Sequence, residues 1–174
     1  KPEILREQLR AIVRTSQFAE VSVLVPMVSS VEEMVAVRSM LNLVKEDLGI
    51  TAEIKLGCMI EVPAAAFIAS DLAKVSDFFS IGSNDLVQYS LAVDRADEHV
   101  SYLYDAAHPA VLKLIHMTMD AARIHGIQVA ICGELASNPQ WTEIFLDLNI
   151  CCLSMSARKI LPIRKQLHHL QALS

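Results

Sequence analysis

Two kinds of apolar segment alternate along this chain, and that alternation limits its fold more than any other feature. Short apolar runs with the length of buried strands are separated by longer segments in which apolar residues recur at helical spacing. The predicted strands span residues 21–27, 55–61, 77–82, 127–133 and 150–155. Such alternation is typical of a parallel sheet covered by helices. The sequence therefore predicts an α/β fold, and the almost wholly apolar strands predict burial of both sheet faces.

Capping residues and prolines indicate where the intervening helices begin and end. Ser30 and Glu33 form a capping box, Pro63 and Pro109 suit first helical turns, and Gly126 suits a helix end. The predicted helices span residues 3–18, 31–48, 64–73, 111–125 and 160–170, with a further one opened by Asn138-Pro139. Five strands are too few for a (β/α)8 barrel, which needs eight. The pattern alone therefore leaves open a small α/β domain or the C-terminal portion of a barrel.

Composition narrows the possible partners. The chain has 174 residues, of which 53% are hydrophobic and 20% charged, so a folded domain with a sizeable core is expected. A net charge of -5 gives no general attraction to nucleic acid or anionic lipid, so any phosphate site would have to be local. We find no apolar run long enough to cross a bilayer, no signal peptide and no lipidation motif, and we expect no membrane insertion.

Cysteine usage favours a reducing compartment. The four cysteines, Cys58, Cys132, Cys151 and Cys152, contain no CxxC pair. Neighbouring residues on a strand point to opposite faces, so a bridge between Cys151 and Cys152 is not expected. A cytoplasmic location is the simpler interpretation.

Polar residues stand at the ends of three predicted strands. Glu61 ends the second strand, Asn84 and Asp85 follow the third, and Cys132 lies at the end of the fourth. The carboxyl ends of parallel strands share one edge of the sheet, where α/β proteins bind ligands. The carboxylates Glu61 and Asp85 could share one hard cation, and Mg²⁺ or Mn²⁺ suits them better than zinc. The alternative is that both carboxylates only cap the helices that follow.

Asn84, Arg95 and Cys132 could supply the remaining chemistry of such a site. An amide and a guanidinium can bind an anion, although an exposed ion pair of Arg95 with Asp94 or Asp97 is favoured by sequence alone. A partly exposed Cys132 thiol could move a proton, whereas a buried one would be an inert core residue.

Blocks of sequence spread over nearly the whole chain carry a family resemblance: residues 1–12, 26–27, 59–64, 78–86, 91–95, 132–136 and 153–156. In their order they resemble the C-terminal phosphoenolpyruvate-binding domain of enzyme I of the bacterial sugar phosphotransferase system, the phosphoenolpyruvate–protein phosphotransferases. The resemblance implies that residues 1–174 are the C-terminal part of a (β/α)8 barrel domain, with the first strands and the phosphohistidine domain absent.

The resemblance also implies roles for matching residues. Glu61 and Asp85 match the magnesium ligands, and the backbone at Asp85 is expected beside Asn84 at the phosphate of the substrate. Asn84 and Arg95 match residues that bind the phosphate of phosphoenolpyruvate, and Cys132 matches the acid that protonates the enolate as pyruvate forms. The implied enzyme transfers phosphate from phosphoenolpyruvate to its own histidine and on to a histidine-containing carrier protein in sugar uptake. It would be a homodimer, and we expect the isolated chain to be inactive.

Related activities remain as alternatives. The nitrogen-related paralogue of enzyme I shares these motifs, and so do pyruvate phosphate dikinases and phosphoenolpyruvate synthases, although residues 88–95 are closer to enzyme I. A non-catalytic dimerisation module is a further alternative for the isolated chain. The sequence departs from the family at Ser83, commonly threonine, and at residues 148–152, where glycine and acidic residues are common. The second departure leaves the geometry of the last strand in question.

Overall fold

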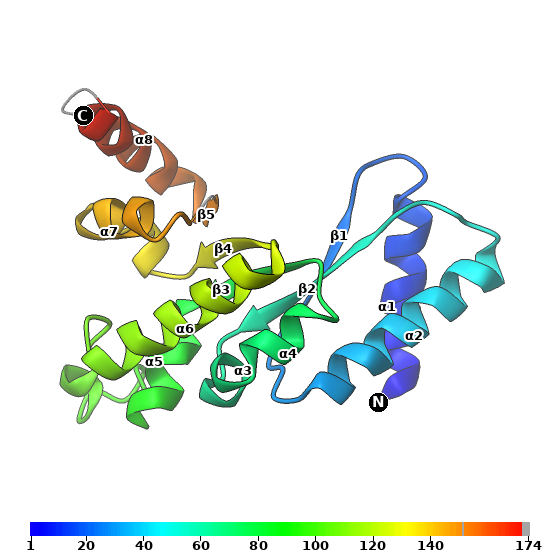
Figure 1. The fold of residues 1–174 in the computed structure, drawn as a ribbon, viewed down its shortest axis with the longest axis horizontal. Helices are drawn as coiled ribbons and strands as arrows, with labels where there is room; N and C mark the ends of the chain where they lie inside the picture. The colour runs from blue at the N-terminus through cyan, green and yellow to red at the C-terminus, as the bar shows by residue number, and fades with distance from the viewer. Residues whose placement is uncertain (151, 172–174) are drawn as a thin grey trace.

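The computed structural model describes residues 1–150 and 152–171 and contains a five-stranded parallel sheet (Figure 1). The strands are β1 (Ser22–Val25), β2 (Lys55–Ile60), β3 (Phe78–Gly82), β4 (Gln128–Cys132) and β5 (Cys152–Ser154). Each lies inside the segment predicted for it, and they pair in chain order, β1-β2-β3-β4-β5. The α/β prediction is confirmed.

The helices follow the capping signals closely. They are α1 (Pro2–Thr15), α2 (Val31–Leu48), α3 (Pro63–Phe67), α4 (Ala69–Ala73), α5 (Ser83–Leu91), α6 (Pro109–His125), α7 (Thr142–Asp147) and α8 (Ala157–Gln171), with 3-10 turns η1 (Ser101–Leu103), η2 (Leu135–Ser137) and η3 (Pro139–Trp141). The Glu33 side chain accepts the Ser30 N–H at 3.0 Å, and Gly126 ends α6 with a φ of 67°. The predicted capping box and the predicted helix end at Gly126 are therefore confirmed.

Several helices differ from their predicted extents. Helix α1 ends at Thr15 rather than at about residue 18, α5 has no predicted counterpart, and Asn138-Pro139 opens the 3-10 turn η3, which precedes α7. The segment predicted as one helix over residues 64–73 is divided into α3 and α4 at Ile68, whose φ and ψ are -105° and 19°. Both pieces bury alanines, Ala65 and Ala69 among them, which allows close packing against α6. The last helix begins at Ala157 rather than residue 160, so Pro162 lies inside it and not in its first turn.

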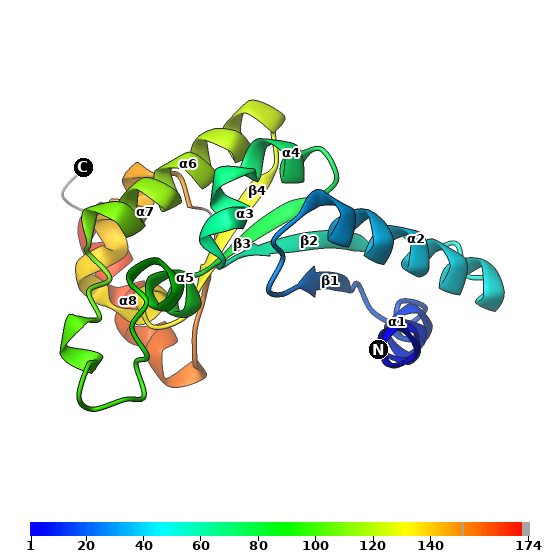
Figure 2. The same ribbon diagram turned by 90° about the horizontal axis from the view of Figure 1, so that it is seen from below.

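The order of the strands determines which face of the sheet is covered. Each crossover moves one strand further in the same direction, and right-handed crossovers then leave their helices on one side. Figure 2 shows α3, α4 and α6 along that side, with α1 and α8 at opposite ends of the curved sheet. Side chains that β2, β3 and β4 place on the covered face are apolar and at most 3% exposed: Leu56, Cys58, Ile60, Phe79, Ile81, Val129 and Ile131.

The prediction that both faces are buried is wrong. On the second face Leu24 is 36% exposed, Met59, Phe78 and Ala130 are half-buried, and Cys152 is exposed. Strand alternation places these residues between the buried ones, and α3, α4 and α6 lie on the opposite side (Figure 2). The second face is therefore the open one, and it runs toward the strand ends where the predicted site lies.

Cys151 lies outside the described residues, so the prediction about its pairing with Cys152 stays a prediction. Within residues 1–150 and 152–171, we find no helix with both the length and the apolar character needed to cross a bilayer.

Adjacent phenylalanines on β3 test the difference between the two faces. Phe79 is fully buried under the helices, whereas Phe78 is half-buried on the open face. We expect Phe79→Ala to lower the free energy of unfolding by about 3–5 kcal/mol, the usual cost of emptying a phenylalanine site in a core. In urea titrations, Phe78→Ala should lower the free energy of unfolding by less than half as much as Phe79→Ala. Equal losses in the two variants would show that the second face is as well packed as the first.

Candidate functional site

The register of three neighbouring strands brings the predicted site residues together. Ile60 on β2 pairs with Ile81 on β3, and Gly82 pairs with Cys132 on β4. Glu61 therefore lies beside Gly82, and a side-chain carbon on Gly82 would be 2.6 Å from Glu61 Oε2. Glycine at this position leaves the space that the Glu61 carboxyl occupies.

Glu61 is a buried carboxyl with one hydrogen bond from the protein. It is 4% exposed, and its Oε1 accepts the Met27 N–H at 2.7 Å. Burial raises the pKa of Glu61, the Met27 N–H lowers it, and the negative charge of Asp85 raises it further. Met27 lies just beyond β1 in the left-handed region, with a φ of 55°, so a fourth strand end contributes to the site. Sequence reasoning missed this backbone donor because side-chain chemistry gives no signal for it.

Among the described residues, Glu61 and Asp85 have no basic partner, and two unpaired carboxylates suit a cation. Each ion pair recorded among the described residues joins groups other than Glu61 and Asp85. The same part of the chain holds no cluster of three or more His, Cys, Asp or Glu side chains arranged for a metal. A pair of carboxylates fits Mg²⁺, which takes one or two protein carboxylates and completes its shell with substrate and water oxygens.

The Asn84 side chain is held through its oxygen, and its amide nitrogen makes no hydrogen bond with the part of the chain that the structure describes. Its Oδ1 accepts the Glu134 N–H at 2.9 Å, while Ser83 Oγ donates to the Cys132 carbonyl at 2.7 Å. Gly133, with a φ of 95°, permits this approach, since a side-chain carbon there would lie 2.5 Å from Ser83 Oγ. The departure from threonine at Ser83 keeps the hydroxyl that makes this bond. The arrangement fixes the Asn84 side chain and leaves Nδ2 as a donor for a ligand.

Cys132 is half-buried, which meets the condition for a thiol that can exchange a proton. Its Sγ donates to the Ile81 carbonyl at 3.4 Å, and Ser80 Oγ donates to Sγ at 3.7 Å. Burial raises the pKa of Cys132, the Ser80 hydroxyl lowers it, and Glu61 and Asp85 raise it. The strand register places Cys132 in one row with Gly82 and Glu61, so the three strand ends lie side by side.

Arg95 is exposed on the loop between α5 and η1, and the ion pair favoured by its sequence context is absent among the described residues. Asp94 and Asp97 instead accept the N–H groups of Ala96 and His99, both at 2.9 Å. The Arg95 guanidinium is left without an acidic partner in this part of the chain. It remains a candidate for anion binding.

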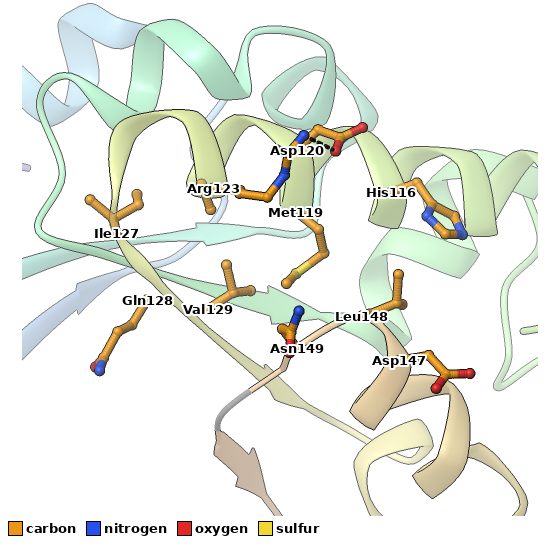
Figure 3. A pocket seen from close by; sticks show the side chains of 11 residues that line it. His116, Met119, Asp120, Arg123, Ile127, Gln128, Val129, Asp147, Leu148 and Asn149 are labelled. Atoms are coloured by element: carbon orange, nitrogen blue, oxygen red, sulfur yellow. Dashed lines mark hydrogen bonds and ion pairs between the residues drawn. The ribbon is translucent and has the colours of Figure 1, made fainter.

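A cavity of about 380 Å³ lies away from these strand ends (Figure 3). It is lined by α6, the start of β4 and the turn after α7, with Met119 pointing inward and the Asp120–Arg123 ion pair at its edge. None of the predicted site residues lines it. The candidate site is therefore a group of converging polar atoms at the edge of the open face, and it is separate from this cavity.

Residues 1–172 match the family described as the PEP-binding domain of PEP-utilising enzymes, where PEP is phosphoenolpyruvate. The chain belongs to this family. That membership confirms the resemblance found in the sequence blocks.

The curated relatives share one name. The chain is 42% identical over 173 residues to a phosphoenolpyruvate-protein phosphotransferase of Bacillus subtilis, and 41% identical to those of Staphylococcus epidermidis and Mycoplasma pneumoniae. The alignments cover 97%, 98% and 94% of this chain but 30%, 31% and 29% of the relatives. The chain thus spans less than a third of their length.

A solved structure supports the fold. A citrate lyase from Burkholderia xenovorans LB400 superposes with a TM-score of 0.73 at 17% identity, covering 92% of this chain and 53% of the lyase chain. At this identity the likeness concerns the fold alone.

The burial of Glu61 leads to a testable effect on stability. Because its pKa is raised on folding, the carboxyl destabilises the folded state as the pH rises from below 4.5 through the folded pKa. We expect Glu61→Gln to raise the free energy of unfolding at pH 7 without metal, since glutamine still accepts the Met27 N–H. The gain should vanish at pH 3 in denaturant titrations. The exposed Glu20→Gln serves as the control, and a stability loss in Glu61→Gln at pH 7 would contradict this account.

Proposed function

We propose that this chain is the phosphoenolpyruvate-binding part of an enzyme I-type phosphotransferase. Such an enzyme passes phosphate from phosphoenolpyruvate to its own histidine and on to a histidine-containing carrier protein. The observation that carries the proposal is that Glu61, Asn84 and Cys132 lie at three adjacent strand ends, with Asp85 in the first turn of the helix that follows β3. The name shared by its relatives favours this function over a dikinase or synthase.

Glu61 and Asp85 would hold Mg²⁺, with Mn²⁺ as a substitute. The fit rests on two carboxylates without a basic partner among the described residues, one of them buried. When bound, the cation would offset negative charge on the substrate oxygens. The buried position of Glu61 would keep competing water from that carboxylate.

The phosphate would bind where α5 begins. The first backbone N–H groups of a helix have no partner within the helix and point toward an anion, and Asp85 lies in that first turn. Asn84 adds the free Nδ2 donor, and Arg95 adds a guanidinium that matches phosphate oxygens. These groups would orient the substrate and stabilise charge on the leaving phosphoryl group.

Cys132 would act as the general acid. Its raised pKa keeps the thiol protonated at neutral pH, ready to give its proton to the terminal carbon of the enolate left when the phosphoryl group departs. That step forms the carbon–hydrogen bond of pyruvate and leaves a thiolate, which the Ser80 hydroxyl stabilises. Solvent then returns the proton to the half-exposed sulfur.

Other features remain predictions. The homodimer, the partial barrel, the carrier partner and a sugar pathway rather than the nitrogen-related one follow from the resemblance, and the cytoplasmic location follows from the cysteine usage.

Substrate binding tests the assignment of the carboxylates. Calorimetric titration of phosphoenolpyruvate into the chain should show binding with Mg²⁺ and little without it. Asp85→Asn should weaken the metal-dependent binding at least tenfold, which corresponds to about 1.4 kcal/mol. Asp105→Asn is the matched control, because Asp105 is exposed and asparagine can still accept the Ala107 N–H. No binding under either condition would instead favour the non-catalytic module.

The reactivity of the Cys132 thiol tests metal binding without substrate. Peptide-resolved alkylation at a series of pH values gives the pH at which the Cys132 thiol is half-reactive, which is its alkylation midpoint. Mg²⁺ should move the Cys132 midpoint to lower pH, because the cation offsets the Glu61 and Asp85 charges that raise its pKa. The shift should disappear in Asp85→Asn. An unchanged Cys132 midpoint at saturating Mg²⁺ would argue against a shared metal.

A further inference from the structure

Tyr104 contacts the same helix terminus as the candidate anion site but has no role in the assignments above. It follows η1, is half-buried, and its hydroxyl donates to the Asn84 carbonyl at 3.4 Å. The side chain of the same Asn84 accepts the Glu134 N–H. Two segments distant in sequence, one after β4 and one after α5, therefore meet at the residue that presents a donor to the ligand.

The loop that carries Arg95 is organised mainly by its own turns. Three aspartates each accept the N–H two residues further on: Asp94 from Ala96, Asp97 from His99, and Asp105 from Ala107. These bonds set local shape but do not locate the loop on the protein. Near its start, Gln88 accepts the Val93 N–H at 3.0 Å through its carbonyl and the Arg95 N–H at 3.4 Å through its side chain. At its far end the Tyr104 hydroxyl makes the link to α5.

The charges of the candidate site also act on the Tyr104 phenol. Burial raises the pKa of Tyr104, Glu134 raises it further, Arg95 lowers it, and Asp85 raises it. By contrast, Tyr102 on the same turn is 79% exposed.

We propose that Tyr104 is a positioning residue, which holds the Arg95 loop against the first turn of α5 through its bond to the Asn84 carbonyl. A loop held in place loses less conformational freedom when a ligand binds, so a preorganised Arg95 binds phosphate more tightly than a loose one. The inference rests on the proposed function, because it takes Arg95 to be a phosphate ligand.

A double-mutant cycle tests whether Tyr104 acts through Arg95. One hydrogen bond is worth about a 3- to 10-fold change in affinity, so Tyr104→Phe should weaken Mg²⁺-dependent phosphoenolpyruvate binding by that factor. In an Arg95→Gln background, Tyr104→Phe should cause no further loss. Tyr102→Phe is the matched control and should leave the affinity unchanged. A full additional loss in the Arg95→Gln background would overturn the proposal.

Amide hydrogen exchange separates this inference from the proposed function. Tyr104→Phe should speed exchange across residues 93–103 and leave α6 unchanged, while Tyr102→Phe should change neither. Unchanged exchange in Tyr104→Phe would overturn the role of Tyr104 whether or not the chain binds phosphoenolpyruvate. Suppose instead that Tyr104→Phe exchanges faster but the unmutated chain binds no phosphoenolpyruvate. The contact of the Arg95 loop with α5 would then be supported, and the proposed function would be overturned.

Discussion

Close packing at two glycines is the constraint on which the rest of the site depends. Glu61, Gly82 and Cys132 stand in one row across β2, β3 and β4, and the Glu61 carboxyl occupies the space beside Gly82. Directly after β4, Gly133 lets the chain pass against Ser83 and Asn84. A methyl group at either glycine would overlap these polar atoms. The row can exist only because the parallel register and the missing side chains coincide.

The negative charges of the candidate site lower the stability of the folded protein. Glu61 is buried close to a second carboxylate, and one backbone N–H is the hydrogen bond recorded for it. A lysine or arginine nearby would stabilise the folded chain, but it would also occupy the position of a cation. The cost in stability is typical of sites whose charges are matched by a ligand rather than by the protein.

Much of the fold and of the site follows from the sequence, because strand alternation and helix capping are local effects. The carboxyl ends of parallel strands share an edge, so Glu61, Asp85 and Cys132 could be placed together before any coordinates were known. The predictions that were wrong depended on geometry beyond the local sequence. Uniform apolar composition suggested two buried faces, whereas the direction of the crossovers decides which face the helices cover. The charges around Arg95 suggested ion pairs, but Asp94 and Asp97 bond to backbone N–H groups instead. The contact between Tyr104 and Asn84 depends on the path of a whole loop.

The open face explains why residues of such different character can serve one site. Alternation along β3 and β4 places Ser80 and Cys132 on that face, while the neighbouring Phe79 and Ile131 form the core under the helices. The core residues hold the strands in register without occupying the space above the sheet. The polar residues can then vary in exposure, from buried Glu61 to exposed Arg95, because they are attached to a frame that is stabilised from the other side. A precise site on one face therefore requires a continuous apolar layer on the other.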